Sequence, residues 1–294
     1  MTLLDPEFRR TWLFGPGADA AAHAAMLRSG ADVVIVDFED STPLERRDEA
    51  RRAIAGLLRQ FREAGAVTAV RINSLDGDGP VDLAAAMPAR PDVIAYPMTN
   101  SVAQMQVLHG ALGQWEARLE IGAGTTEILP VCETALGVAD IRAIAAGSSR
   151  IRCALLGAED LAADLCAERQ PDALELDYAR RRFVLECRAA GIEPVDAPYT
   201  FSDVEGAVRE ARYARRLGYR CKSVVCPEHT PLVNAALTPS DEEVRRATAM
   251  IEAFEAARAR GEDRALVDGL WVEVPTYRNA RRLLERAQRL SLRK

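Results

Sequence analysis

The chain has 294 residues, of which 48% are hydrophobic and 28% are charged, and its formal net charge is −6. This composition is ordinary for a globular protein, and the length suits a single α/β barrel with a sizeable core. The negative charge argues against a surface that binds nucleic acid or an anionic membrane, so we expect neither as a partner.

The cysteines and the N-terminal segment indicate the compartment. The six cysteines form no C-x-x-C pair, so nothing indicates a zinc ribbon, and a chain of this length does not need a disulfide framework. Residues 1–10 lack the apolar stretch of a secretory signal, and no apolar run approaches the roughly 18 residues that span a bilayer. We therefore expect a cytoplasmic protein with reduced thiols.

Short runs of β-branched residues alternate along the chain with longer segments rich in Ala, Leu and Arg. After the second run, Ser41 is expected to cap the helix that follows. The pattern predicts eight strands, at residues 11–14, 33–36, 67–72, 93–96, 128–131, 151–156, 194–197 and 223–225. Such alternation indicates a parallel sheet with right-handed crossovers. Eight units favour a (β/α)8 TIM-type barrel, with an open doubly wound sheet as the alternative.

The C-terminal part follows a different pattern. A helix is expected at residues 241–260, and Gly261-Glu262-Asp263 then interrupts it. The tail holds a strand-like piece at residues 270–274 and a basic amphipathic helix from Tyr277 onward. We therefore expect a barrel domain at residues 1–262 and a helical arm at residues 263–294. The arm's apolar Leu270 and Trp271 are unusual on a monomer, so we place the arm at a subunit interface.

Charged residues cluster where the expected strands end, which is the catalytic end of a barrel of this kind. They are Asp37, Glu39, Asp40, Arg71, Glu133, Glu159, Asp160 and Asp196. Converging carboxylates make an oxygen-rich site that suits Mg2+. The three histidines form no metal-spaced pair, which argues against a zinc site. The alternative is that these residues are helix caps or ion-pair partners, with Glu159 and Asp160 capping a helix and Arg71 pairing with Asp37 or Glu39.

The turn Gly15-Pro16-Gly17 is open to two interpretations. It either lets the backbone approach a phosphate group or makes only a tight turn between a strand and a helix.

Seven segments, in order along nearly the whole chain, carry a family resemblance. They are Arg10-Thr-Trp-Leu-Phe-Gly-Pro-Gly17, Val36-Asp-Phe-Glu-Asp-Ser41, Val70-Arg-Ile-Asn73, Val131-Cys-Glu-Thr-Ala-Leu-Gly137, Leu156-Gly-Ala-Glu-Asp-Leu-Ala162, Cys187-Arg-Ala-Ala-Gly-Ile192 and Asp268-Gly-Leu-Trp-Val-Glu-Val-Pro275. At these residues the chain resembles the citrate lyase β-subunit and malyl-CoA lyase family, within the HpcH/HpaI aldolase superfamily. The resemblance implies a Mg2+-dependent carbon–carbon lyase. It would cleave or form a 3-hydroxy-acyl thioester of CoA or a carrier protein, such as citryl-, malyl- or citramalyl-CoA, with a 2-oxo acid and an acyl thioester as products.

The resemblance also implies roles for single residues. Glu133 and Asp160 would hold Mg2+, or Mn2+ in its place, and Arg71 would bind the oxo-acid portion. Glu273 matches an aspartate that serves as acid/base and comes from a neighbouring subunit of a homotrimer or hexamer. Phe14, Gly15 and Gly17 are expected to contact the substrate, and Asp37, Glu39 and Asp40 to support the metal and Arg71.

The chain departs from the family pattern at three places. Met98 follows Pro97 where the family has Lys, Cys226 stands in an altered segment after the eighth strand, and Glu273 replaces Asp. These changes bear on the thioester and the substrate, and they leave two alternatives open. One is a metal-dependent 2-oxo-acid aldolase that works without CoA. The other is a non-catalytic relative that binds metal and an acyl-CoA.

Overall fold

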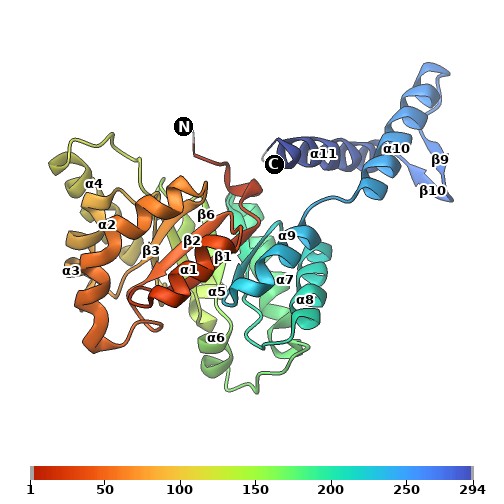
Figure 1. Cartoon of the computed structure of the whole chain (residues 1–294). Coiled ribbons are helices and arrows are strands. Elements are labelled where there is room, and N and C mark those ends of the chain that lie inside the picture. The colour runs from red at the N-terminus through yellow and green to blue at the C-terminus, as the bar shows by residue number, and fades with distance from the viewer. Residues whose placement is uncertain (1–2, 293–294) are drawn as a thin grey trace. The chain divides into compact units, whose positions relative to one another are not determined.

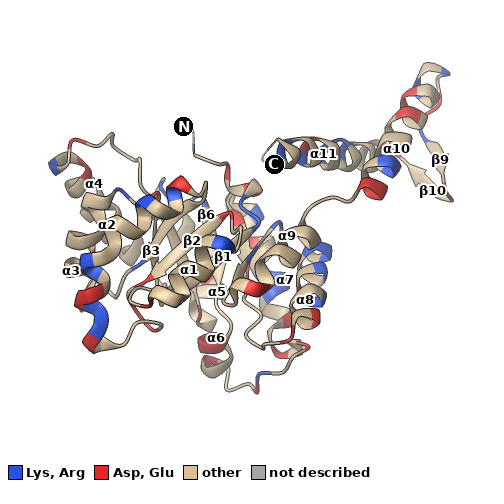
Figure 2. Ribbon diagram, viewed as in Figure 1, with Lys and Arg blue, Asp and Glu red and all other residues tan. Residues whose placement is uncertain are grey.

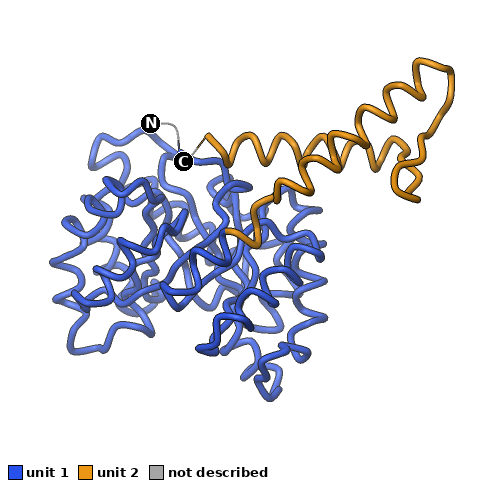
Figure 3. Tube along the Cα trace, turned by 45° about the vertical axis from the view of Figure 1, so that its right-hand side comes forward, with its two compact units in different colours: residues 1–234 blue, residues 235–294 orange. Residues whose placement is uncertain are grey.

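The computed structural model describes residues 3–292, so the first two residues of the expected barrel domain and the last two of the expected arm lie outside the described residues. The chain forms two compact units, Met1–Asn234 and Ala235–Lys294, coloured separately in Figure 3. The division at residue 234 differs from the expected boundary at 262, because the long helix after Ser240 packs against the C-terminal helix and joins the second unit.

The first unit is a closed barrel of eight parallel strands in sequence order, seen in Figure 1. The strands are β1 (Thr11–Pro16), β2 (Val33–Asp37), β3 (Val67–Arg71), β4 (Val93–Tyr96), β5 (Glu127–Cys132), β6 (Cys153–Leu156), β7 (Glu193–Asp196) and β8 (Cys221–Val224). All eight expected strands are confirmed, seven of them with ends shifted by one or two residues, and the open sheet is excluded because β8 pairs with β1. Ile151, expected at the start of β6, makes only an isolated bridge to Ile128.

Alternate residues of the strands fill the barrel interior with apolar side chains. Trp12, Ile35, Val131 and Val195 belong to this core, and Trp12 is fully buried. Most strand residues are tan in Figure 2, whereas the helices carry both signs of charge. Because side chains alternate, a charged residue at the carboxyl end of a strand points inward only if its register matches that of the core residues.

Helices follow the strands and cover the barrel. They are α1 (Ala20–Arg28), α2 (Arg47–Glu63), α3 (Gly79–Ala86), α4 (Val102–Arg118), α5 (Ala135–Ala145), α6 (Glu159–Asp164), α7 (Asp177–Ala190), α8 (Val204–Leu217) and α9 (Thr230–Leu237), and short 3-10 turns lie at Pro6–Phe8, Leu44–Arg46, Met87–Ala89, Leu174–Leu176 and Pro227–His229. Ser101 and Gln104 form a capping box at the start of α4. The expected cap at Ser41 was wrong, because α2 begins only at Arg47, after a 3-10 turn, and Ser41 donates to Asp37 instead.

The second unit contains α10 (Asp241–Ala259), a hairpin of β9 (Ala265–Val267) and β10 (Leu270–Val272), and α11 (Val274–Ser291). Phe254 of α10 stacks on Tyr277 of α11 with ring centroids 4.9 Å apart. The strand expected at residues 270–274 is shorter in the structure and ends at Val272. The final helix begins at Val274 rather than at Tyr277.

Between residues 3 and 292 the helices are either too short or too polar to cross a membrane. All six cysteines are free thiols, and four of them are buried.

Candidate active site

Asp37 and Arg71 are the last residues of β2 and β3, and they are paired partners in the sheet register. Both point inward at the carboxyl end of the barrel, where Arg71 Nε donates to Asp37 Oδ1 and Nη2 donates to Oδ2, each at 2.6 Å. The remaining nitrogen, Nη1, lies 2.7 Å from Glu39 Oε2 and 3.6 Å from Asp40 Oδ2. Arg71 therefore pairs with both Asp37 and Glu39, the two partners that the sequence offered as alternatives. Only its Nη1 atom is not bonded to Asp37.

Asp37 is held as an anion. Burial acts to raise the pKa of its carboxyl, but the Arg71 guanidinium and the hydrogen bonds from Ser41 outweigh burial and leave that pKa below its ordinary value. Its Oδ2 accepts from the Ser41 N–H at 2.7 Å, and its Oδ1 accepts from the Glu39 N–H at 3.0 Å. A buried carboxylate with this many donors fixes the orientation of Arg71.

Glu39 is a different case, because it is half-buried without good hydrogen bonds. Its Oε2 makes a close ion pair with Arg71 but no hydrogen bond of acceptable geometry. Burial raises the pKa of Glu39 to about 7, with Arg71 opposing and the charges of Asp40, Asp37 and Glu133 adding to the rise. Glu39 is therefore the weakly held carboxylate beside Arg71.

Glu133 follows β5 directly and is only 4% exposed. Its Oε1 accepts a hydrogen bond of 2.7 Å from the N–H of Met98. Burial raises the pKa of Glu133 to about 7; Met98 and Arg71 oppose the rise, and Asp160 contributes to it. Arg71, Asp160 and Glu133 thus share one electrostatic environment.

Asp160 lies in the first turn of α6, and its side chain is exposed. The residue before this helix, Ala158, is the N-cap, and no side chain caps the helix. Asp160 therefore does not act as the helix cap that the alternative interpretation proposed. Glu159, next to it, is instead tied to Arg169 and Thr200.

The negative charge of the carboxylates at this end of the barrel suits a bound cation. The carboxylates of Asp37, Glu39, Asp40 and Glu133 lie around the Arg71 guanidinium, and Asp160 adds negative charge near Glu133. Between residues 3 and 292, no three His, Cys, Asp or Glu side chains are grouped so as to hold a metal. Two carboxylates are nevertheless enough for Mg2+, which keeps several waters and binds through one or two carboxylates plus substrate oxygens. The carboxylates of Glu133 and Asp160 are of the chemical type that such a Mg2+ site requires.

The turn after β1 borders this site. Phe14 is half-buried, and its ring centroid lies 5.3 Å from Arg71 Cζ. The Gly17 N–H donates to Asp37 O at 3.0 Å and to Thr42 Oγ1 at 2.7 Å. A Cβ at Gly17 would lie 2.6 Å from Ala50 Cβ, so glycine is needed for close packing. The Gly17 amide is thus engaged within the protein, and Gly15 lies in β1, paired with Val36.

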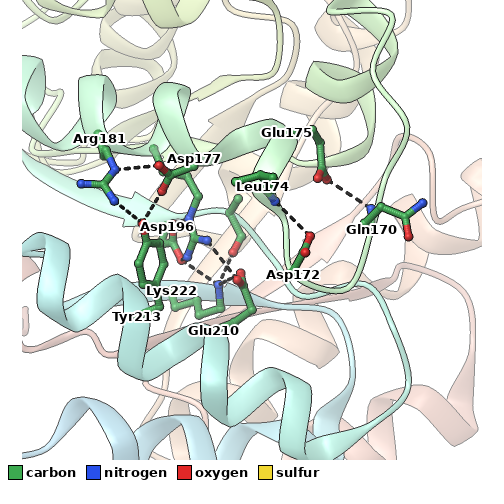
Figure 4. Close-up of polar contacts among 12 residues, drawn as sticks. Gln170, Asp172, Leu174, Glu175, Asp177, Arg181, Asp196, Glu210, Tyr213 and Lys222 are labelled. Atoms are coloured by element: carbon green, nitrogen blue, oxygen red, sulfur yellow. Dashed lines mark hydrogen bonds and ion pairs between the residues drawn. The ribbon is translucent and has the colours of Figure 1, made fainter.

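Asp196 was expected among the charges of the active site, and this was wrong. Its neighbour Val195 belongs to the barrel core, so Asp196 points outward into the helix layer. Figure 4 shows it beside Lys222 and Glu210: Arg180 donates to it at 2.8 and 2.9 Å, and Lys222 Nζ at 2.7 Å. Asp196 is therefore part of a buried charge network that joins β7 and β8 to α7 and α8.

Glu273 lies in the second unit, at the N-cap position of α11. It is exposed, and its side chain makes no hydrogen bond or ion pair with any residue that the structure describes. Glu273 is thus available for contacts outside this unit.

Two contributors to the site were missed from the sequence. The Met98 main chain holds Glu133, and Gly157 packs against it, so that a Cβ there would lie 2.5 Å from Glu133 Cβ. A backbone N–H leaves no signal in the sequence. The glycine directly after the sixth strand was a signal of close packing that could have been used.

The chain is similar in sequence and fold to proteins of known family. The HpcH/HpaI aldolase/citrate lyase family matches residues 10–227, which include all eight barrel strands. The chain is 32% identical to the citrate lyase subunit beta of Haemophilus influenzae over 284 residues, covering 96% of this chain and 98% of that protein. It is 31% identical to the L-malyl-CoA/beta-methylmalyl-CoA lyase of Cereibacter sphaeroides over 307 residues, covering 96% and 95% of the two chains.

A solved structure adds ligands to this comparison. The protein CitE of Mycobacterium tuberculosis, in complex with magnesium, acetoacetate and coenzyme A, matches with a TM-score of 0.74 at 28% identity. The match covers 95% of this chain and 98% of that one.

Proposed function

The chain belongs to the HpcH/HpaI aldolase/citrate lyase family, and we propose that it is a Mg2+-dependent carbon–carbon lyase of 3-hydroxy-acyl thioesters. The observation that carries the proposal is the grouping of Arg71, Glu133 and Asp160 at the carboxyl end of the barrel. A guanidinium beside a pair of carboxylates that fits a divalent cation is suited to a 2-oxo acid, which carries a carboxylate next to a carbonyl.

The reaction is a reversible cleavage. The 3-hydroxyl of the thioester loses its proton, the bond between C2 and C3 breaks, and the oxygen becomes the carbonyl of the 2-oxo acid. The electron pair of the broken bond passes to the thioester portion as an enolate, which then takes up a proton. Bound Mg2+ would supply Lewis-acid polarisation of that oxygen.

The residues of the chain have separable roles in this proposal. Glu133 and Asp160 hold the metal, and Arg71 binds the carboxylate of the oxo acid. Because Asp37 occupies Nε and Nη2, the substrate carboxylate approaches Nη1, where Glu39 now lies. Binding therefore moves the loosely held Glu39 away from Arg71, while Asp37 keeps the guanidinium in place.

The remaining expected site residues border this centre. Phe14 would form one wall of the substrate site through its contact with Arg71, and Gly15 and Gly17 would shape the turn next to it. Asp40 would support Arg71 from the solvent side.

Glu273 is proposed as the acid/base group, supplied by a neighbouring subunit of a homotrimer or hexamer. Its carboxylate is exposed, and the hairpin before it carries exposed Leu266, Leu270 and Trp271. An apolar hairpin of this kind favours a protein partner, so the arm at residues 263–294 is proposed to lie at the subunit interface. The six free thiols support a cytoplasmic location.

The proposal is tested by presenting the purified protein with malyl-, citramalyl- and citryl-CoA, and with the corresponding free hydroxy acids. Release of a 2-oxo acid is followed by a coupled dehydrogenase. We expect turnover of at least one thioester and none of the free acids. Turnover of the free acids alone would establish the aldolase without CoA. Binding of a thioester without any turnover would indicate the non-catalytic relative.

A further inference from the structure

The carboxylate of Glu133 is bordered on two sides, by the main-chain N–H of Met98 and by Gly157. On one side, the Met98 N–H donates to Oε1 at 2.7 Å. On the other side, Gly157 leaves room for the side chain, because a Cβ there would lie 2.5 Å from Glu133 Cβ and 3.1 Å from Oε2. The two oxygens of Glu133 are therefore not equivalent.

Met98 adopts a conformation that its residue type disfavours. Its φ is 46°, in the left-handed region, where side chains other than Gly and Asn are strained. Such strain persists only where the surrounding structure imposes it. The following residue, Thr99, donates its N–H to Val131 O at 3.0 Å, and Gln104 Nε2 donates to Met98 O at 3.3 Å. These bonds hold the turn after β4 in place and aim the Met98 N–H at Glu133.

Gly157 completes the arrangement from β6. Its N–H donates to Cys132 O at 2.9 Å, which keeps the end of β6 against the end of β5. The chain continues from Gly157 directly into α6, whose first turn carries Asp160. Oε2 of Glu133 therefore lies beside the segment that leads to the second carboxylate, whereas Oε1 is engaged by Met98.

We propose that Met98, through its main-chain N–H, and Gly157, through its missing side chain, are positioning residues that hold the Glu133 carboxylate so that its Oε2 would be presented to the metal. The inference rests on the proposed function, since it assumes that Glu133 is a metal ligand. A hydrogen bond to the other oxygen of a ligating carboxylate fixes its direction, and loss of such a partner typically weakens metal affinity about 10- to 100-fold.

The test is a calorimetric titration of the full-length protein with Mn2+ and with Mg2+, together with the electron paramagnetic resonance spectrum of bound Mn2+. Gly157→Ala should weaken the affinity about 10- to 100-fold and change the spectrum. The matched control is Gly56→Ala in α2, where a Cβ meets nothing within 4 Å, and it should leave both unchanged. Equal affinity and spectrum in Gly157→Ala and wild type would overturn the role of Gly157.

A second substitution tests Met98 without relying on Gly157. Incorporating the α-hydroxy-acid analogue of methionine at position 98 replaces the N–H by an ester oxygen and keeps the side chain. We expect a similar loss of affinity, whereas Met98→Leu, which keeps the N–H, should match wild type. An ester variant that binds metal as tightly as wild type would overturn the role of the Met98 amide, even if Gly157→Ala fails to fold.

Failure of this inference differs from failure of the metal site itself. Glu133→Ala is included in the same titrations. If Glu133→Ala keeps wild-type affinity, Glu133 is not a ligand and the proposed metal site is wrong. If Glu133→Ala loses the metal but the Gly157 and ester variants do not, the metal site stands and the positioning roles are wrong.

Discussion

Arg71 and Asp37 meet through two parallel hydrogen bonds of 2.6 Å, formed between the last residues of neighbouring strands. The pair is almost completely buried, with side-chain exposures of 9% and 0%. Asp37 thereby sets which face of the guanidinium remains for a ligand.

Arg71→Lys is expected to weaken binding of oxaloacetate or pyruvate at least about tenfold, because an ammonium keeps the charge but loses the planar fork. The planar guanidinium can donate two hydrogen bonds to Asp37 through Nε and Nη2 and still present Nη1 to a substrate carboxylate. Calorimetric titration in the presence of Mg2+ measures the effect. Equal affinity in the two proteins would remove Arg71 from oxo-acid binding.

Asp37→Asn should change how stability depends on pH. The pKa of Asp37 is lowered on folding, so its stabilising contribution is present above the ordinary carboxyl pKa and is lost as the pH falls through the folded value. The difference in free energy of unfolding between wild type and Asp37→Asn should be largest near neutral pH and should shrink below about pH 4. Urea unfolding across that range measures it. A difference that does not vary with pH would show that the Asp37 charge contributes nothing.

Glu39→Gln should tighten binding of the oxo acid. The variant removes a negative charge that competes for Nη1 of Arg71, and removal of about 1 kcal/mol of competing interaction corresponds to about fivefold in affinity. The titration is done at pH 8 with saturating Mg2+, so that Glu39 is ionised in wild type. Asp40→Asn, which alters a more distant and exposed carboxylate, serves as the control and should have a smaller effect. Weaker binding in Glu39→Gln would show that Glu39 supports the substrate rather than competing with it.

The proposed subunit interface is tested by measuring the molecular mass in solution and by assembling mixed oligomers of two variants. Light scattering at micromolar concentration should give a trimer or a multiple of it, and a monomer would contradict the interface. Glu273→Gln and Arg71→Ala subunits, each inactive alone, should regain part of their activity in mixed oligomers, because some sites then combine an intact Arg71 with an intact Glu273. Mixed oligomers that stay inactive would count against a site shared between subunits.

The barrel was predictable from the sequence because its signal is repeated eight times. Runs such as residues 93–96 are too short for a helix and too apolar for a loop. The predicted ends of each strand therefore lie within two residues of the observed ends. The second unit was harder, because nothing in the sequence of residues 241–260 indicates whether this helix packs on the barrel or on α11.

The site was only partly predictable, for a geometric reason. Arg71 and Asp37 were identified as possible partners because each ends a strand. Asp196 also ends a strand but points outward, and only the alternation relative to the apolar Val195 decides this. Main-chain contacts such as the Met98 N–H to Glu133 depend on a backbone angle that a methionine does not signal.

The central claim is that Glu133 holds a Mg2+ needed for thioester cleavage, and one measurement tests it most directly. Wild type and Glu133→Ala are stripped of metal, and release of 2-oxo acid from malyl-, citramalyl- and citryl-CoA is measured as Mg2+ is added back. Wild type should cleave at least one thioester only when Mg2+ is present, and Glu133→Ala should stay inactive at the Mg2+ concentration that saturates wild type. Equal turnover of the two proteins, or turnover by wild type without any divalent metal, would contradict the claim.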